Sequence, residues 1–94
     1  MIIQANTILK DFAGKELKQD GENLTLGKAL SNCLLTSKVT GKMKLYLLAQ
    51  KLFSQDKVEV DESDLNLIKN CAEGSEMYHA LVIGQVQLLL SGVK

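Results

Sequence analysis

Hydrophobic residues recur at helical spacing in two segments of the first half of the chain. The first predicted helix begins near Asn23 or Thr25, whose side-chain oxygens can cap its first amides, and the second runs from about Lys42 to Ser54. In both segments the apolar residues follow an i, i+3, i+4, i+7, i+8 pattern, which places them on one helix face. We therefore expect each helix to bury a continuous stripe. The stripes are Leu26, Ala29, Leu30, Cys33 and Leu34, and then Leu45, Leu48, Ala49, Leu52 and Phe53.

Two more helices are predicted in the second half of the chain. Asp61 can cap the third, with Asp64 in a position that resembles a capping box, and both carboxylates favour the positive end of the helix dipole. Gly74 is expected to end this helix and Ser75 to cap the last one. The last helix is apolar over half of its circumference or more, so we expect it to be central to the core or shared with another chain. The predicted buried face of the third helix is Leu65, Ile68, Cys71 and Ala72.

Short strands are predicted near the N-terminus and between the second and third helices. The segment from Ile8 to Leu17 indicates a hairpin closed near Gly14, and a second turn is expected at Gln19–Asn23. Lys57–Val60 alternates polar and apolar residues as a half-buried strand does, and it is expected to pair with the hairpin. The predicted fold class is α+β, mostly helical, with about four helices and a small N-terminal β-hairpin or three-stranded sheet.

Composition limits both the architecture and the function. The chain has 94 residues, of which 46% are hydrophobic and 23% charged, so one domain over residues 1–94 is expected. Eleven lysines balance eleven acidic residues, and arginine is absent. A neutral chain without guanidinium groups has neither the basic field nor the bidentate forks of a general nucleic-acid binder. No secretory signal and no apolar stretch long enough for a membrane span are visible, so a cytoplasmic location without membrane association is expected.

The net charge of zero results from two neighbouring segments of opposite charge. Residues 38–55 contain four lysines and no acid, whereas residues 56–76 contain seven acids and two lysines. One interpretation is two solvated faces that attract each other weakly. The other is a dipolar surface that steers a partner or stacks against copies of itself.

Catalytic and metal chemistry find little support in the sequence. Cys33, Cys71 and His79 have no short-spaced pair among them, so no metal site and no cofactor are expected. Cys71 and His79 fall in successive helices, but a cysteine beside an apolar stripe usually behaves as a small hydrophobic residue. Two reduced, buried thiols are favoured over a disulfide. We therefore expect that this protein is not an enzyme.

Candidate binding residues are basic, aromatic or small. Gly27 and Gly84 lie inside predicted helices, where glycine often marks the close approach of another backbone. Gly84, with Leu81 and Leu88, is predicted to mediate self-association along the last helix. A lysine-rich segment containing Tyr46 offers a surface for a protein partner or, alternatively, for a small anionic nucleotide stacked on Tyr46 or Tyr78. The candidate partner-binding residues are Lys42, Lys44, Tyr46, Lys51, Tyr78 and His79.

Four short motifs resemble a class of small proteins of tailed bacteriophages and prophages. They are Leu24-Thr25-Leu26-Gly27, the helix containing Leu45 and Ala49-Gln50-Lys51-Leu52, the pair Val58-Glu59-Val60 and Leu67-Ile68-Lys69, and Val82-Ile83-Gly84-Gln85. The stretch from Cys71 to Ala80, which includes the loop around Gly74, departs from the class.

The resemblance carries over no catalytic residue. It implies a protein made inside an infected bacterium that binds other molecules rather than converting them. The expected function is that of a phage accessory protein that binds and inhibits a host enzyme or defence component. The alternatives are sequestration of an anionic nucleotide and a role in virion assembly.

Overall fold

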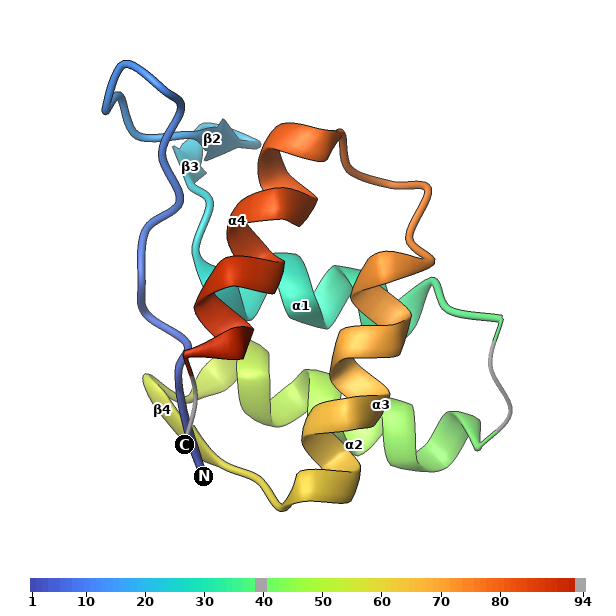
Figure 1. The fold of residues 1–94 in the computed structure, drawn as a ribbon. Helices are drawn as coiled ribbons and strands as arrows, with labels where there is room; N and C mark the ends of the chain where they lie inside the picture. Colours follow the sequence, from blue (N-terminus) through green and yellow to red (C-terminus); the bar gives the residue numbers. More distant parts are fainter. Residues whose placement is uncertain (39–40, 93–94) are drawn as a thin grey trace.

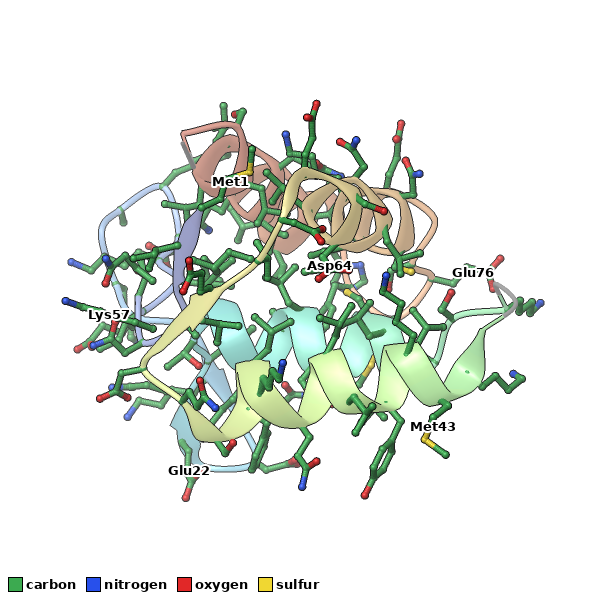
Figure 2. All side chains as sticks on the ribbon, turned by 90° about the horizontal axis from the view of Figure 1, so that it is seen from below. Met1, Glu22, Met43, Lys57, Asp64 and Glu76 are labelled. Atoms are coloured by element: carbon green, nitrogen blue, oxygen red, sulfur yellow. The ribbon has the colours of Figure 1, made fainter. Side chains whose placement is uncertain are left out.

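The structure, a computed structural model, describes residues 1–38 and 41–92, which contain four helices in two layers. They are α1 (Leu26–Leu35), α2 (Lys42–Ser54), α3 (Glu62–Glu73) and α4 (Ala80–Ser91). α1 and α2 lie side by side in one layer, and α3 and α4 cross them in the other (Figure 1). Figure 2 shows the same two layers from below. The predicted class, α+β and mostly helical, is confirmed.

The strands form two separate antiparallel pairs. β1 (Ile2–Gln4) pairs with β4 (Lys57–Glu59), and β2 (Lys18–Gln19) pairs with β3 (Glu22–Asn23). The predicted partner of the strand at residues 57–60 was therefore wrong, because this strand pairs with β1 rather than with the expected hairpin. The turn predicted at residues 19–23 is confirmed, since it joins β2 to β3.

The predicted hairpin is present but shorter than residues 8–17, with a bridge between Lys10 and Glu16 and backbone hydrogen bonds from Leu17 to Leu9 and from Asp11 to Lys15, both at 2.9 Å. Asp11 explains this difference, because its side chain accepts hydrogen bonds from the amides of Ala13 and Lys15, both at 2.9 Å. Residues 11–15 thus form a tight turn instead of extending the strands. The expected role of Gly14 is confirmed by its positive φ of 84°.

The core lies between the two helical layers and the β1–β4 pair. The expected stripe of α1 is buried in full, and that of α2 is buried except for Phe53, which is 65% exposed. α1 is covered by α2, α3 and α4, so a wide face is buried, whereas α2 packs mainly on α1 and β4. The prediction for Phe53 was wrong because α2 lacks a neighbour on that side.

The start of α3 is as predicted, but the start of α4 is not. Asp61 caps α3 by accepting a hydrogen bond from the Asp64 amide at 2.7 Å, and Gly74 ends the helix. Ser75 does not cap the last helix, which begins five residues later with His79 at the N-cap position. The Tyr78 side chain is held by α1 and β2, which keeps the preceding segment outside the helix.

α4 lies at the periphery, so of the two alternatives, a helix central to the core or one shared with another chain, the first was wrong. Only Val86 and Leu90 of this helix are buried, while Leu88 is 76% exposed. Polar contacts also hold it in place: the Gln85 side chain bonds to both the backbone amide and the carbonyl of Lys10, and Gln87 donates to the Lys69 carbonyl. α4 is therefore an outer helix with a largely apolar, solvent-facing side.

The two helical glycines differ in their surroundings. A Cβ at Gly27 would overlap the Leu52 carbonyl oxygen and lie 2.8 Å from the Ala5 Cβ, whereas a Cβ at Gly84 would meet no atom within 4 Å. The close approach expected of such glycines is confirmed at Gly27. Gly84 makes no close contact with the described part of its own chain.

Candidate functional site

The outward side of α2 carries a second apolar stripe that the fold does not bury. Leu45, Leu48, Ala49 and Leu52 point into the core, and a different set of large side chains lies on the opposite side. We call this set the outer α2 face. It consists of Met43, Tyr46, Leu47 and Phe53, which are 72%, 55%, 48% and 65% exposed.

Figure 2 shows Met43 on the side of α2 turned away from α3 and α4. The spacing of the four residues, i, i+3, i+4 and i+10, keeps them on one broad side of the helix. A helix with apolar stripes on two sides can bury only one of them against its own core. The outer α2 face therefore remains available to another molecule.

A shallow groove runs beside the outer α2 face where α1 and α2 meet. It has a volume of about 480 Å³, and Leu35, Tyr46 and Phe53 contribute its large apolar side chains. Leu35 is itself 57% exposed. Tyr46 also lines a smaller pocket of about 210 Å³ together with Lys42. The two hollows place Tyr46 at the centre of an apolar surface that spans both helices.

Three lysines of α2 flank this surface, but only two of them are free of an acidic partner in the described structure. Lys44 forms an ion pair with Asp64 of α3 at 2.8 Å, whereas no ion pair is formed by Lys42 or Lys51. Figure 2 shows Asp64 between the two layers. The Asp64 carboxylate, as hydrogen-bond acceptor and opposite charge, raises the pKa of Lys44. Lys44 thus joins the basic and acidic segments, and Lys42 and Lys51 give the surface its positive character.

The remaining predicted partner-binding residues lie elsewhere. The Tyr78 hydroxyl accepts a hydrogen bond from Asn32 at 2.7 Å and donates one to Gln19 at 2.9 Å. His79 is exposed at the start of α4. Tyr78 is therefore committed to joining α1 and β2, and neither residue belongs to the outer α2 face.

The lysines do not surround one cavity, as a nucleotide site would require. Lys38 lines a pocket near α3, Lys42 lines the small pocket beside Tyr46, and Lys51 lines a hollow that also contains Asp61 and Asp64. The carboxylates of this last hollow would repel a phosphate. Lys38, Lys42 and Lys51 therefore line three different pockets and do not converge on one anion.

The self-association residues share one solvent-facing strip of α4. Leu81, Gly84 and Leu88 follow i, i+3, i+7 spacing, and the last two are exposed while Leu81 is half-buried. The buried residues Val86 and Leu90 lie on the opposite side of the helix. These three residues therefore share one face of α4, and this face points away from the core.

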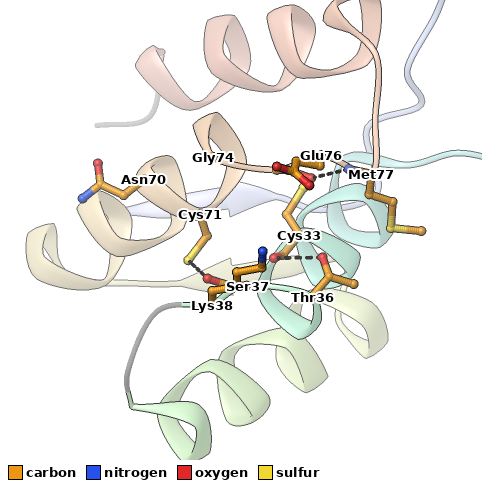
Figure 3. A pocket seen from close by; sticks show the side chains of 10 residues that line it. Cys33, Thr36, Ser37, Lys38, Asn70, Cys71, Gly74, Glu76 and Met77 are labelled. Atoms are coloured by element: carbon orange, nitrogen blue, oxygen red, sulfur yellow. Dashed lines mark hydrogen bonds between the residues drawn. The ribbon is translucent and has the colours of Figure 1, made fainter.

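Both cysteines border a pocket of about 610 Å³ between α1, α3 and the segment that leads to α4 (Figure 3). Cys33 and Cys71 are buried, free thiols, and the Cys71 thiol donates a hydrogen bond to Ser37 at 3.4 Å. Burial raises the pKa of Cys33, which disfavours the thiolate that a nucleophile or a metal ligand needs. In Figure 3 the two sulfur atoms point to different sides of the pocket. The arrangement fits two structural thiols.

The described residues contain neither a metal-binding cluster nor a helix that could span a membrane. Within residues 1–38 and 41–92, no cluster of three or more His, Cys, Asp or Glu side chains is placed to hold a metal ion. No helix in the described ranges combines the length and apolar character needed to cross a membrane. Comparisons with family models, curated proteins and solved structures found no match to this chain. Function must therefore be argued from the surface itself.

Sequence reasoning identified part of the outer α2 face and missed the rest. Lys42, Tyr46 and Lys51 were named, but Met43 and Leu47 were not, and Phe53 was assigned to the core. The missed signal is present in the sequence, because Met43, Tyr46 and Leu47 repeat the i, i+3, i+4 spacing on a second side of the same helix.

Proposed function

We propose that this protein is a non-catalytic binding module that holds a protein partner on its outer α2 face. The observation that carries the proposal is the second apolar stripe of α2, formed by Met43, Tyr46, Leu47 and Phe53 and left exposed by the fold. Aromatic and methionine side chains are enriched at protein interfaces. Burying each large side chain contributes about 1.5–3 kcal/mol, so a few such contacts suffice for a specific complex.

The chemistry of the surface indicates the class of partner. Residues 38–55 contain no acid, and Lys42 and Lys51 lie on either side of the apolar stripe. The groove beside Leu35 and Tyr46 matches the way in which an amphipathic helix is held, by apolar side chains at i, i+3, i+4 and i+7. The complementary partner is an amphipathic helix, or an equivalent protein ridge, whose apolar stripe is bordered by Asp and Glu.

A second copy of this chain is a poor occupant of the same face. Two copies meeting through α2 would bring Lys42 and Lys51 of both copies into one contact to which α2 contributes no acid. Like charges brought together in this way oppose binding. The partner is therefore a different protein. In the setting that the sequence resemblance implies, it is a host enzyme or defence component in the bacterial cytoplasm, inhibited because this protein covers its surface.

Capture from a bacterial lysate tests the proposal when it is combined with two matched variants. Phe53→Glu removes an apolar side chain and adds a charge that repels an acidic partner. Phe12→Glu makes the same change at a fully exposed residue of the turn at residues 11–15, which lies at the other end of the molecule from α2 (Figure 1). We expect the wild type and Phe12→Glu to retain the same host protein. Phe53→Glu is expected to bind it at least tenfold more weakly, which corresponds to about 1.4 kcal/mol.

Three outcomes would contradict this account. The first is that the wild type retains no specific host protein, and the second is that both variants weaken capture equally. The third is retention of a virion component in place of a host protein, which would move the assignment to virion assembly.

A further inference from the structure

α4 contains a glycine, Gly84, that the fold of its own chain does not require. Gly84 lies in the middle of the helix, where glycine is less favourable than alanine. Its φ is negative, so no left-handed conformation requires it, and a Cβ at this position would meet no atom within 4 Å. Open space above a helical glycine allows the backbone of another helix to approach closely.

The residues around Gly84 form a surface that is apolar and uncharged. Leu88 is 76% exposed, and Leu81 lies one turn before Gly84 on the same side. The whole of α4, from Ala80 to Ser91, contains no charged residue. This composition distinguishes α4 from α2, whose outward side carries lysines.

The absence of charge points to the occupant of this surface. In a two-fold symmetric contact a patch meets its own copy, so a patch whose charges are all of one sign repels itself. α4 avoids this repulsion. Its strip is also symmetric about its middle, because Leu81 and Leu88 lie on either side of Gly84. In an antiparallel pair, Leu81 of one copy would pack on Leu88 of the other while the two glycines bring the backbones together.

We propose that two copies of this chain associate through α4, with Leu81, Gly84 and Leu88 of each copy at the centre of an antiparallel, two-fold contact. The α2 surfaces stay free on both copies, because α2 belongs to the other layer (Figure 1). The inference does not depend on the proposed partner of α2, and either can fail without the other.

Sedimentation velocity or light scattering over a wide range of protein concentrations tests the proposal directly. We expect the wild type to pass from the monomer mass of 10.3 kDa to twice that mass as its concentration rises. Leu88→Glu should remain monomeric over the whole range. Leu47→Glu, the same change on the outer α2 face, should dimerise like the wild type. A wild type that stays monomeric at the highest concentration would overturn the proposal, as would equal effects of the two variants.

Gly84→Gln separates association from folding. The side chain points into open space and glutamine favours the helix, so the thermal midpoint measured on dilute, monomeric protein should rise or stay unchanged. The same variant should lose dimerisation, because the longer side chain holds the two helices apart. Retained dimerisation of Gly84→Gln would contradict the close contact at this position.

Discussion

Replacing Gly27 with alanine is expected to destabilise the fold strongly, although alanine is the better helix former. The amide of Gly27 donates to the Ala5 carbonyl at 2.8 Å, so α1 begins in direct contact with the N-terminal segment. A methyl group at this position would overlap the Leu52 carbonyl oxygen and lie 2.8 Å from the Ala5 Cβ. The first is a backbone atom and the second is bonded directly to the backbone, so neither can turn aside as the end of a long side chain can.

The magnitude follows from two opposing contributions. Overpacking a filled site costs about 1–3 kcal/mol, and here the upper part of that range applies because backbone atoms are in the way. The gain in helix propensity offsets up to about 1 kcal/mol. The net loss in the free energy of unfolding is therefore about 2 kcal/mol. With the urea dependence usual for a small protein, this loss lowers the unfolding midpoint by about 1 M or more.

Gly84→Ala is the matched control, because it makes the same change in a helix where the space is open. It should stabilise the dilute protein by about 0.5–1 kcal/mol. Urea unfolding followed by circular dichroism would measure both variants under identical conditions. If Gly27→Ala proved as stable as the wild type, the close packing of α1 against residues 5 and 52 would be refuted.

Three further predictions concern caps and titrating groups. Asp61→Ala should lower the free energy of unfolding, measured in urea, by about 0.5–2 kcal/mol, because the cap of α3 is lost. Ser75→Ala removes no helix cap and should lower it less. Equal losses would contradict the assignment of the caps. Cys33 should react slowly with a thiol reagent in the native state, and fast labelling would be inconsistent with its burial. Because the pKa of Cys33 is raised in the folded protein, the free energy of unfolding should fall as the pH rises through the ordinary thiol range. The pKa of Glu22 is lowered by its hydrogen bond from Lys28 and by the lysine charge. The pair therefore stabilises the fold at pH values above the ordinary carboxyl pKa and loses this effect as the pH falls. NMR titration should show that the pKa of Glu22 is higher in Lys28→Gln than in the wild type.

Local signals in the sequence were sufficient to locate most of the helices. The bounds of α2 were predicted correctly because its apolar spacing is regular over the whole helix, and Asp61 identified the start of α3 because capping involves only neighbouring residues. The start of α4 was missed because it depends on distant residues. Tyr78 bonds to Asn32, which lies 46 positions away, and no local pattern encodes that contact.

The candidate surface was only partly predictable for a related reason. An apolar stripe predicts burial, but which of two stripes faces the core depends on which helices cover it. α1 buries an apolar residue at the i+8 position because three helices surround it, while Phe53 at the same position in α2 is exposed. The placement of Lys44 against Asp64 also required the fold, because the two residues belong to crossed helices in different layers.

The central claim is that the outer α2 face binds an acidic, apolar surface of another protein. The most direct measurement is the affinity of the captured partner for the wild type, Phe53→Glu and Phe12→Glu, determined by titration at two salt concentrations. We expect Phe53→Glu to bind at least tenfold more weakly and Phe12→Glu to bind like the wild type. Added salt should weaken binding, because it screens the charges of Lys42 and Lys51. Equal affinities for all three proteins, without dependence on salt, would contradict it.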